Sequence, residues 1–230
     1  MTTVAVNLQA VRARIESACK AAGRPPDAVR LLAVSKTFGP DELREAAAAG
    51  QRDFGENYVA EGVEKILACA ELGLTWHCIG PLQSNKTRLV AEHFDWVHSI
   101  DRLRIAERLS AQRPADRPPL QVCIQVNIDG GPTKAGVAPG EALALARAVA
   151  ALPGLRLRGL MTIPEPAADF DAALAVHRRT RALFDALVAE GLPLDTLSMG
   201  MSADLEAAIA AGSTLVRVGT AIFGGRARRG

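Results

Sequence analysis

The amino-acid sequence predicts an α/β fold, a (β/α)8 TIM barrel with one extra helix before its first strand. Eight strand-like apolar runs are spread along 230 residues, and segments with helical periodicity separate them. Nearly continuous apolar runs are typical of parallel strands buried on both faces, and strands that alternate with helices imply a parallel sheet. Eight strands in a chain of this length favour a closed barrel over an open, doubly wound sheet. The first run is followed by SKTFGP rather than G-x-G-x-x-G, so a dinucleotide-binding fold has no fingerprint here.

The first predicted element is an amphipathic helix that ends at Gly23 and the two prolines after it. Its apolar face consists of Val4, Leu8, Val11, Ile15 and Cys19. The strand-like runs that follow are VRLLAVSK (29–36), RDFGEN (52–57), TWHCIG (75–80), DWVHSI (95–100), LQVCIQVNI (120–128), LRLRGLMTI (155–163), LDTLSMG (194–200) and TLVRVGTAIFG (214–224). Stretches such as DELREAAAAG (41–50) and GEALALARAVAAL (140–152) carry helical periodicity, and every strand except the last has a helix candidate after it. The longest predicted loop is 129–140, and 224–230 is predicted to be a frayed basic tail.

The composition is that of an ordinary soluble globular protein, with 49% apolar and 23% charged residues. No low-complexity linker divides the chain, so we expect a single domain over residues 1–230. A formal net charge of +2 produces no field that would indicate a nucleic acid or membrane partner. Nucleic-acid-binding modules also use interleaved aromatic residues, and these make up only 4% of the chain, so nucleic acid binding is disfavoured.

The cysteines and histidines indicate no metal site. The four cysteines are scattered without a C-x-x-C pair, and the four histidines lack the paired spacing of zinc ligands. We therefore expect reduced, mostly buried thiols. No apolar segment is long enough to span a bilayer, and polar residues interrupt the region where a signal peptide would have its apolar core. The expected location is the cytoplasm.

Lys36 is the first candidate functional residue because it ends the first predicted strand, in a chain with only five lysines among 27 basic residues. The active sites of such barrels lie at the carboxyl ends of the strands. Burial of a lysine at this position disfavours its charged form, and the neutral amine can form a Schiff base with a carbonyl. The alternative is a structural cation that reaches solvent or pairs with a carboxylate such as Glu56.

Two other strand ends predict an anion site. Ser202, in SMGMSADLEAAIAAG, has the position of a helix N-cap, and the free N–H groups of a helix start accept phosphate. Gly219 and Thr220, in RVGTAIFGG, add backbone amides and a hydroxyl. Phosphate sites after the seventh and eighth strands recur in this fold. A Schiff-base lysine opposite such a cradle fits a pyridoxal 5′-phosphate (PLP) site, and it also fits a phosphosugar aldolase.

Five motifs occur in order over almost the whole chain: AVSKT, FGENYVAEG, WHCIGPLQSNK, LSMGMSADLEAAI and VRVGTAIFG. In these motifs the chain resembles the pyridoxal phosphate homeostasis protein family, small proteins related to the barrel domain of alanine racemase. The resemblance implies a fold-type III barrel with an added N-terminal helix, no second β domain and PLP as cofactor.

The resemblance also implies a role for individual residues. Lys36 matches the lysine that forms the Schiff base, and Arg217 matches the arginine that faces the pyridine nitrogen. The full set of matched cofactor-binding positions is Lys36, Asn57, Met201, Ser202, Arg217, Gly219 and Thr220. Other motif residues, to which the resemblance assigns no firm cofactor contact, are His77, Asn85 and Lys86. The loop GGPTKAGV resembles the Lys-x-Gly loop of the family, here Lys134 to Gly136.

Chemistry at the pyridine nitrogen favours a carrier over an enzyme. A permanently charged guanidinium keeps this nitrogen unprotonated and weakens the ring as an electron sink. Alanine racemases use the same arrangement, but their second base is a tyrosine from a further domain. Here the only tyrosine is Tyr58, at the start of a predicted helix.

Three hypotheses follow, in descending order. The first is a PLP carrier or buffer in vitamin B6 homeostasis, without robust catalysis and with PLP-dependent apoenzymes as possible recipients. The second is a PLP-dependent amino-acid racemase, and the third is a Schiff-base aldolase. We expect a monomer.

Overall fold

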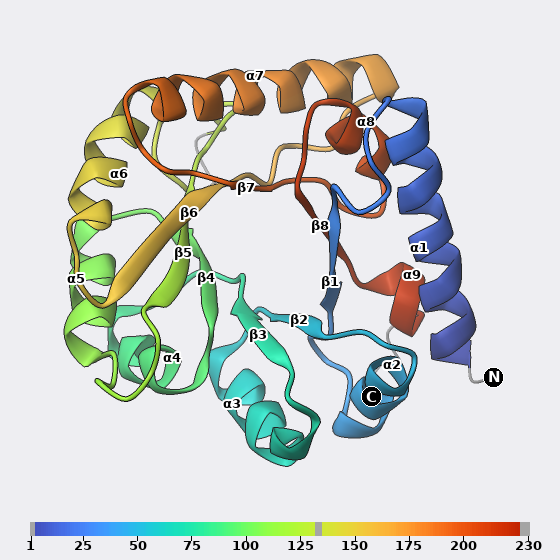
Figure 1. Cartoon of the computed structure of the whole chain (residues 1–230), viewed down its shortest axis with the longest axis horizontal. Helices are drawn as coiled ribbons and strands as arrows, with labels where there is room; N and C mark the ends of the chain where they lie inside the picture. The colour runs from blue at the N-terminus through green and yellow to red at the C-terminus, as the bar shows by residue number, and fades with distance from the viewer. Residues whose placement is uncertain (1–2, 132–134, 226–230) are drawn as a thin grey trace.

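Eight parallel strands form a closed barrel in the computed structural model, which describes residues 3–131 and 135–225 (Figure 1). The strands follow one another around the barrel in chain order, and pairing of the last strand with the first closes it. They are β1 (Arg30–Val34), β2 (Asp53–Glu56), β3 (Thr75–Cys78), β4 (Trp96–Ile100), β5 (Leu120–Gln125), β6 (Leu155–Met161), β7 (Thr196–Ser198) and β8 (Leu215–Val218). Each predicted strand is present, and the predicted barrel is confirmed.

Helices surround the barrel (Figure 1). The α-helices of the described residues are α1 (Thr3–Ala21), α2 (Pro40–Ala48), α3 (Val59–Ala68), α4 (Thr87–His93), α5 (Leu103–Gln112), α6 (Ala142–Ala150), α7 (Phe170–Ala189), α8 (Leu205–Ala210) and α9 (Thr220–Phe223). Three 3-10 helices lie in the connections, namely η1 (Ala70–Leu72), η2 (Ser84–Lys86) and η3 (Pro139–Glu141). The predicted helix at 41–50 is α2, and the one at 140–152 is α6 with η3 before it.

The end of the barrel differs from the sequence prediction. The apolar run 214–224 is predicted to be one strand without a following helix, but β8 stops at Val218 and α9 follows it. The backbone turns at Gly219, whose carbonyl accepts hydrogen bonds from the amides of Ile222 and Phe223 at 2.8 and 3.0 Å. The apolar run continues because Ile222 is fully buried in the outer core, so continuity of apolar residues does not distinguish the strand from the helix.

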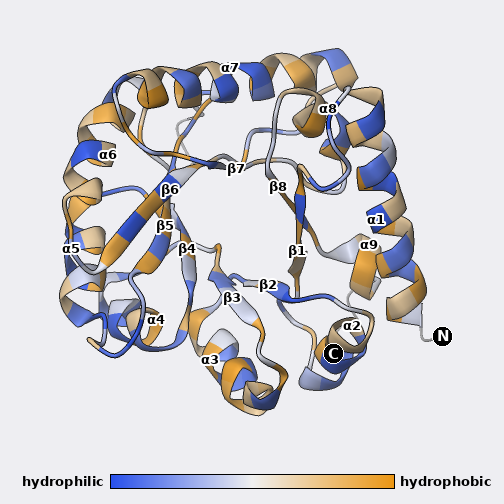
Figure 2. Ribbon diagram, in the orientation of Figure 1, coloured by the Kyte–Doolittle hydropathy of each residue, from blue (hydrophilic) through white to orange (hydrophobic). Residues whose placement is uncertain are grey.

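The hydrophobic core has two layers, one inside the barrel and one between the strands and the helices. Side chains of successive strand residues alternate between these layers. Two small clusters lie inside the barrel and contain Leu32, Ile79 and Leu215, and Trp96, Cys123 and Met161. The large outer cluster includes Ala33, Phe54, Val97, Leu197 and Val216 together with the apolar helix residues. Figure 2 shows hydrophobic and hydrophilic residues alternating along the helices, as expected for elements with one buried face.

Helix α1 is the predicted extra helix, and its apolar face is buried as predicted. It ends where Gly23 takes a left-handed φ of 66°. The helix lies beside α8 and α9 at the other end of the chain. Asn7 Nδ2 donates to the carbonyl oxygen of Ile222 at 3.0 Å, and Arg14 forms an ion pair with Glu206 at 2.5 Å.

Several smaller predictions concern the rest of the chain. The four cysteines are buried and none forms a disulfide. Among the described residues, no helix has the length and apolar character needed to cross a membrane. The predicted loop 129–140 ends in η3, and its residues 132–134 lie outside the described residues, as does most of the predicted tail at 226–230.

Candidate functional site

The carboxyl ends of the strands meet at one end of the barrel, and this end carries most of the predicted site residues. Lys36 is half-buried and lies two residues beyond β1. Leu32 and Val34 face the barrel interior, and strand alternation assigns Lys36 to the same face. Gly219, the residue after β8, lies against the end of β1, because a Cβ atom at Gly219 would be 3.0 Å from the carbonyl oxygen of Val34.

The backbone is strained directly after Lys36. Thr37 has a left-handed φ of 70°, a conformation that β-branched residues rarely adopt and that costs on the order of 1–3 kcal/mol. Its amide donates to Glu61 Oε1 at 2.5 Å, and the Phe38 ring stacks on Phe223 of α9 with centroids 5.0 Å apart. Strain of this kind is concentrated at functional sites, so it favours a functional role for the turn that presents Lys36.

A buried lysine holds the same turn from the helix side of the barrel wall. Lys65 Nζ, from α3, donates to the carbonyl oxygen of Ser35 at 2.7 Å and to carboxylate oxygens of Glu56 and Glu61 at 2.8 and 2.6 Å. Ser35 Oγ also donates to Glu56 at 2.5 Å. We call these four residues the Lys65 cluster. Glu56, which the sequence offers as a partner for Lys36, is thus bonded by Ser35 and Lys65.

The Lys65 cluster contains a carboxylate, that of Glu56, which is buried away from water. The side chain of Glu56 is 0% exposed and that of Lys65 is 5% exposed. Burial raises the pKa of the Glu56 carboxyl, while the Lys65 ammonium and the hydrogen bonds from Lys65 and Ser35 act in the opposite direction. The ion pair therefore compensates for a charge that would otherwise be costly to bury.

Arg217 is fixed inside the barrel. Its Nη1 donates to the carbonyl oxygen and to Oγ of Ser198, each at 2.7 Å, and Nη2 donates to the carbonyl oxygen of Thr162 at 2.8 Å. Burial lowers the pKa of its guanidinium to about 10, with the carboxylate of Asp204 acting in the opposite direction. The group thus stays a cation at neutral pH, held in one orientation by the ends of β6 and β7.

The turn after β7 differs from the prediction that Ser202 caps a helix. Helix α8 starts at Leu205, and Asp204 occupies its N-cap position. Ser202 lies in the preceding turn, where the amide of Met201 donates to Asp204 Oδ1 at 2.7 Å. Gly200, with a left-handed φ of 95°, leads into this turn, and its carbonyl accepts from the Arg217 amide at 3.0 Å. The turn therefore lies next to β8, but Ser202 is not the cap.

Buried polar atoms without a hydrogen-bond partner gather near the carboxyl ends of β2 and β6. They are Glu56 Oε2, Asn57 Oδ1 and Thr162 Oγ1. Buried polar groups in proteins are nearly always hydrogen-bonded, so such atoms are candidates for contact with a ligand or water. Asn57, predicted to line the barrel mouth, is one of them.

The remaining motif residues lie in different environments. His77 is fully buried in β3, where it bonds to Asp53 at 3.0 Å and to His98 at 2.9 Å. Asn85 is exposed and Lys86 is half-exposed in η2. Lys134 of the predicted Lys-x-Gly loop lies outside the described residues.

Sequence reasoning missed Lys65, His98 and Ser198. The rarity of lysine in this chain, which singled out Lys36, applies equally to Lys65. The pattern of the fourth strand places His98 two residues after Trp96, on the same face.

Two pockets flank the carboxyl end of the barrel. One of about 590 Å³ lies between the turn at 37–40 and α3, and one of about 470 Å³ lies between residues 164–170 and the turn before α8. Within the described part of the chain, no group of three or more His, Cys, Asp and Glu side chains is arranged to hold a metal ion.

The chain matches the alanine racemase N-terminal domain family over residues 6–227. It is 60% identical over 226 residues to the pyridoxal phosphate homeostasis protein of Pseudomonas aeruginosa, with 98% of this chain and 97% of that relative covered. The protein of the same name from Escherichia coli K12 is 57% identical over 229 residues, and 98% of each chain is covered. The chain belongs to the pyridoxal phosphate homeostasis protein family.

A solved structure agrees with this assignment. PipY of Synechococcus elongatus PCC7942, determined with PLP bound, superposes with a TM-score of 0.84 and 39% sequence identity, covering 96% of this chain and 100% of PipY. The family predicted from five sequence motifs is thereby confirmed.

Proposed function

We propose that this protein is a single-domain barrel over residues 1–230 that binds PLP and carries or buffers it in vitamin B6 homeostasis, without robust catalysis. The observation that carries the proposal is the placement of an amine and a fixed guanidinium in one barrel, with Lys36 beyond β1 and Arg217 in the paired strand β8. The names of the relatives and the PLP in PipY support the choice of ligand.

The residues of the barrel mouth fit PLP in chemical type. Lys36 supplies the amine for a covalent bond to the aldehyde carbon of PLP. Arg217, a donor only, suits an unprotonated pyridine nitrogen. Ser202 and Thr220 supply hydroxyls and Gly219 a close backbone approach, all suited to a phosphate group. The buried, unpartnered Oδ1 of Asn57 and the half-buried Met201 complete the proposed set, Lys36, Asn57, Met201, Ser202, Arg217, Gly219 and Thr220.

The same residues favour a carrier over an amino-acid racemase, which is the second candidate. PLP supplies an electron sink for amino-acid chemistry, most strongly when its ring nitrogen is protonated, and Arg217 opposes that protonation. A racemase also needs a second base facing Lys36. Tyr58, the only tyrosine, is 60% exposed at the N-cap of α3, which does not favour that role.

Recipients and location belong to the same proposal. We infer that PLP-dependent apoenzymes receive the cofactor from a monomeric protein. The four buried cysteines, none in a disulfide, support a reducing compartment and therefore the cytoplasm.

The deciding experiment is an absorbance spectrum of the purified protein with added PLP, followed by borohydride reduction and peptide mass mapping. We expect a visible band that reduction converts into a phosphopyridoxyl group on the peptide containing Lys36. The absence of a band would contradict both PLP hypotheses. Exchange of the α-hydrogen of alanine with solvent, measured on the loaded protein, then separates the two, because a carrier shows no robust turnover.

Replacement of Ser202 by alanine is expected to weaken PLP binding by about 1–2 kcal/mol, or roughly 5- to 30-fold in Kd, because a charge-assisted hydrogen bond to the phosphate is lost. The measurement is a spectroscopic titration with PLP. Ser17→Ala on the exposed face of α1 is the matched control and should leave Kd unchanged. Equal Kd values for Ser202→Ala and the wild type would remove Ser202 from the phosphate site.

A further inference from the structure

A line of buried polar side chains runs through the barrel interior from the start of β2 to β8. Asp53 Oδ1 lies 3.0 Å from His77 Nε2, and His77 Nδ1 lies 2.9 Å from His98 Nε2. His98 Nδ1 lies 2.8 Å from Ser198 Oγ, which accepts from Arg217 Nη1 at 2.7 Å. We call this line, from Asp53 to Arg217, the interior chain. His77, His98 and Ser198 are all 0% exposed, so water does not reach the links between them.

The chemistry of its ends gives the interior chain one direction. Burial raises the pKa of the Asp53 carboxyl, but the hydrogen bond from His77 and the charges around it hold this pKa below its usual value, so Asp53 is an acceptor at neutral pH. His77 must then donate from Nε2. Burial lowers the pKa of both histidines, and a neutral ring that donates from Nε2 accepts at Nδ1.

The same logic determines the next two links. Since His77 Nδ1 accepts, His98 donates to it from Nε2 and therefore accepts at Nδ1 from the hydroxyl of Ser198. The oxygen of that hydroxyl accepts from Arg217, which can only donate. Every hydrogen bond thus points from Arg217 towards Asp53, and hydrogen bonds aligned in this way polarise and strengthen one another.

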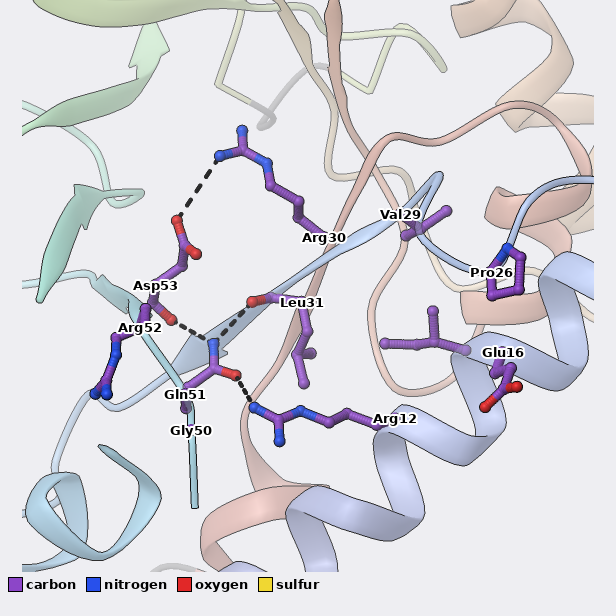
Figure 3. Close-up of a pocket in the computed structure, with 11 residues that line it drawn as sticks. Arg12, Glu16, Pro26, Val29, Arg30, Leu31, Gly50, Gln51, Arg52 and Asp53 are labelled. Atoms are coloured by element: carbon purple, nitrogen blue, oxygen red, sulfur yellow. Dashed lines mark hydrogen bonds and ion pairs between the residues drawn. The ribbon is translucent and has the colours of Figure 1, made fainter. Parts of the chain in front are cut away.

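The Asp53 end of the interior chain lies at the amino-terminal end of the barrel strands, opposite to the end that carries Lys36. Asp53 is the first residue of β2, with a side chain 22% exposed, and it lies 3.8 Å from Arg30. Figure 3 shows these two side chains beside a pocket of about 420 Å³ that Arg12 of α1 and Gln51 also line. On the other side of the histidines, the ring of Trp96 stacks on His77 with centroids 5.3 Å apart. The rings are therefore enclosed by the barrel wall, and only Asp53 opens to the pocket.

We propose that Asp53, His77, His98 and Ser198 are positioning residues that hold the Arg217 guanidinium for the ring nitrogen of PLP. This inference rests on the proposed function in its last step, because Arg217 is the only member assigned to the cofactor. Arg217 bonds to carbonyl oxygens and one hydroxyl, and the interior chain connects that hydroxyl to the carboxylate of Asp53. The Asp53 carboxylate fixes both tautomers whatever the interior chain serves, so the effect of Asp53 on bound PLP is what separates a positioning role from a structural one.

The first test needs no cofactor. Nitrogen-15 NMR of the histidine side chains at neutral pH should show a proton on Nε2 and none on Nδ1 for both His77 and His98. In Asp53→Ala, the acceptor at the outer end is lost, so the resonances of both rings should shift towards a mixture of tautomers. Asp53→Asn keeps an acceptor oxygen and should restore the wild-type pattern. Asp195→Ala, which removes a carboxylate bonded to Arg158 rather than to a histidine, is the control and should leave both rings unchanged.

The second test uses the loaded protein. We expect Asp53→Ala to shift the visible band of bound PLP and to raise its Kd about fivefold, the scale of one hydrogen bond, while Asp53→Asn stays within about twofold of the wild type. A proton on Nδ1 of His98 in the wild type, or an unchanged His98 tautomer in Asp53→Ala, would overturn the interior chain. Wild-type tautomers as described in a protein that binds no PLP would overturn the proposed function and leave the chain itself standing. Tautomers that shift in Asp53→Ala without any change in the bound PLP would overturn the role of positioning Arg217.

Discussion

Lys36→Ala is expected to abolish the covalent bond between the protein and PLP and to leave the barrel folded. Lys36 lies beyond β1 and is only half-buried, so its side chain contributes little to the core, whereas its amine is the proposed attachment point. The visible band should disappear, and borohydride reduction should leave the peptide containing residue 36 unmodified. Circular dichroism should show an unchanged melting temperature.

Lys20→Ala is the matched control for this variant, since Lys20 is exposed in the last turn of α1. It should retain the band and the modified peptide in full. A band of wild-type position and intensity in Lys36→Ala would place the attachment on another lysine and contradict the assignment of Lys36.

Lys65→Met is expected to destabilise the protein by about 3–5 kcal/mol at pH 7, the cost of leaving a buried charge without its partner. Glu56 is 0% exposed, and Lys65 is the cation that bonds to it. The same substitution removes the hydrogen bond to the Ser35 carbonyl, so the turn that presents Lys36 should also loosen. Urea unfolding followed by circular dichroism measures the loss of stability.

The pH dependence of this loss follows from the pKa of Glu56, which burial already raises and which Lys65 opposes. Without Lys65 the folded-state pKa rises further above the unfolded one, so the folded state binds the proton more readily. Stability contributed by that proton is present at low pH and lost as the pH rises through the folded pKa. The deficit of Lys65→Met relative to the wild type should therefore shrink between pH 7 and pH 5.

Glu56→Gln combined with Lys65→Met provides the control, because it removes both charges and should recover part of the lost stability. Lys20→Met, on the exposed side of α1, should unfold at the wild-type urea concentration. A Lys65→Met variant as stable as the wild type at pH 7 would show that burying Glu56 without Lys65 costs no free energy of unfolding.

The fold was accessible from the sequence because each strand is an apolar run with its own helix after it. The pattern misplaced one boundary, where the residues of a strand and of the following helix are equally apolar. In the run 214–224, Val216, Val218 and Ile222 are all buried in the outer core, although the first two lie in a strand and the third in a helix. Only the turn at Gly219 separates them, and this glycine is the one sign in the run of where the strand ends.

The site was only partly accessible from the sequence. Lys36 could be found from its place at a strand end, and Arg217 from the resemblance of its motif to the family. Lys65 could not be assigned, because it comes from the last turn of α3, and a lysine on a helix normally faces solvent. Ser202 was misplaced as a cap because Asp204, two residues later, takes that position. The tautomer-specific contacts of His77 and His98 depend on strand register, which a strand pattern does not specify.

Closure of the barrel also determines when this protein can fold during its synthesis. Strand β1 has an unpaired edge until β8 is made, and α1 contacts α8 and α9, with one hydrogen bond joining residues 215 positions apart. A ribosome-bound chain lacking its last segment would expose an apolar helix face and an open sheet edge, both prone to aggregation. Contacts of such long sequence separation also slow folding. The nascent protein should therefore depend on chaperones until translation is nearly complete.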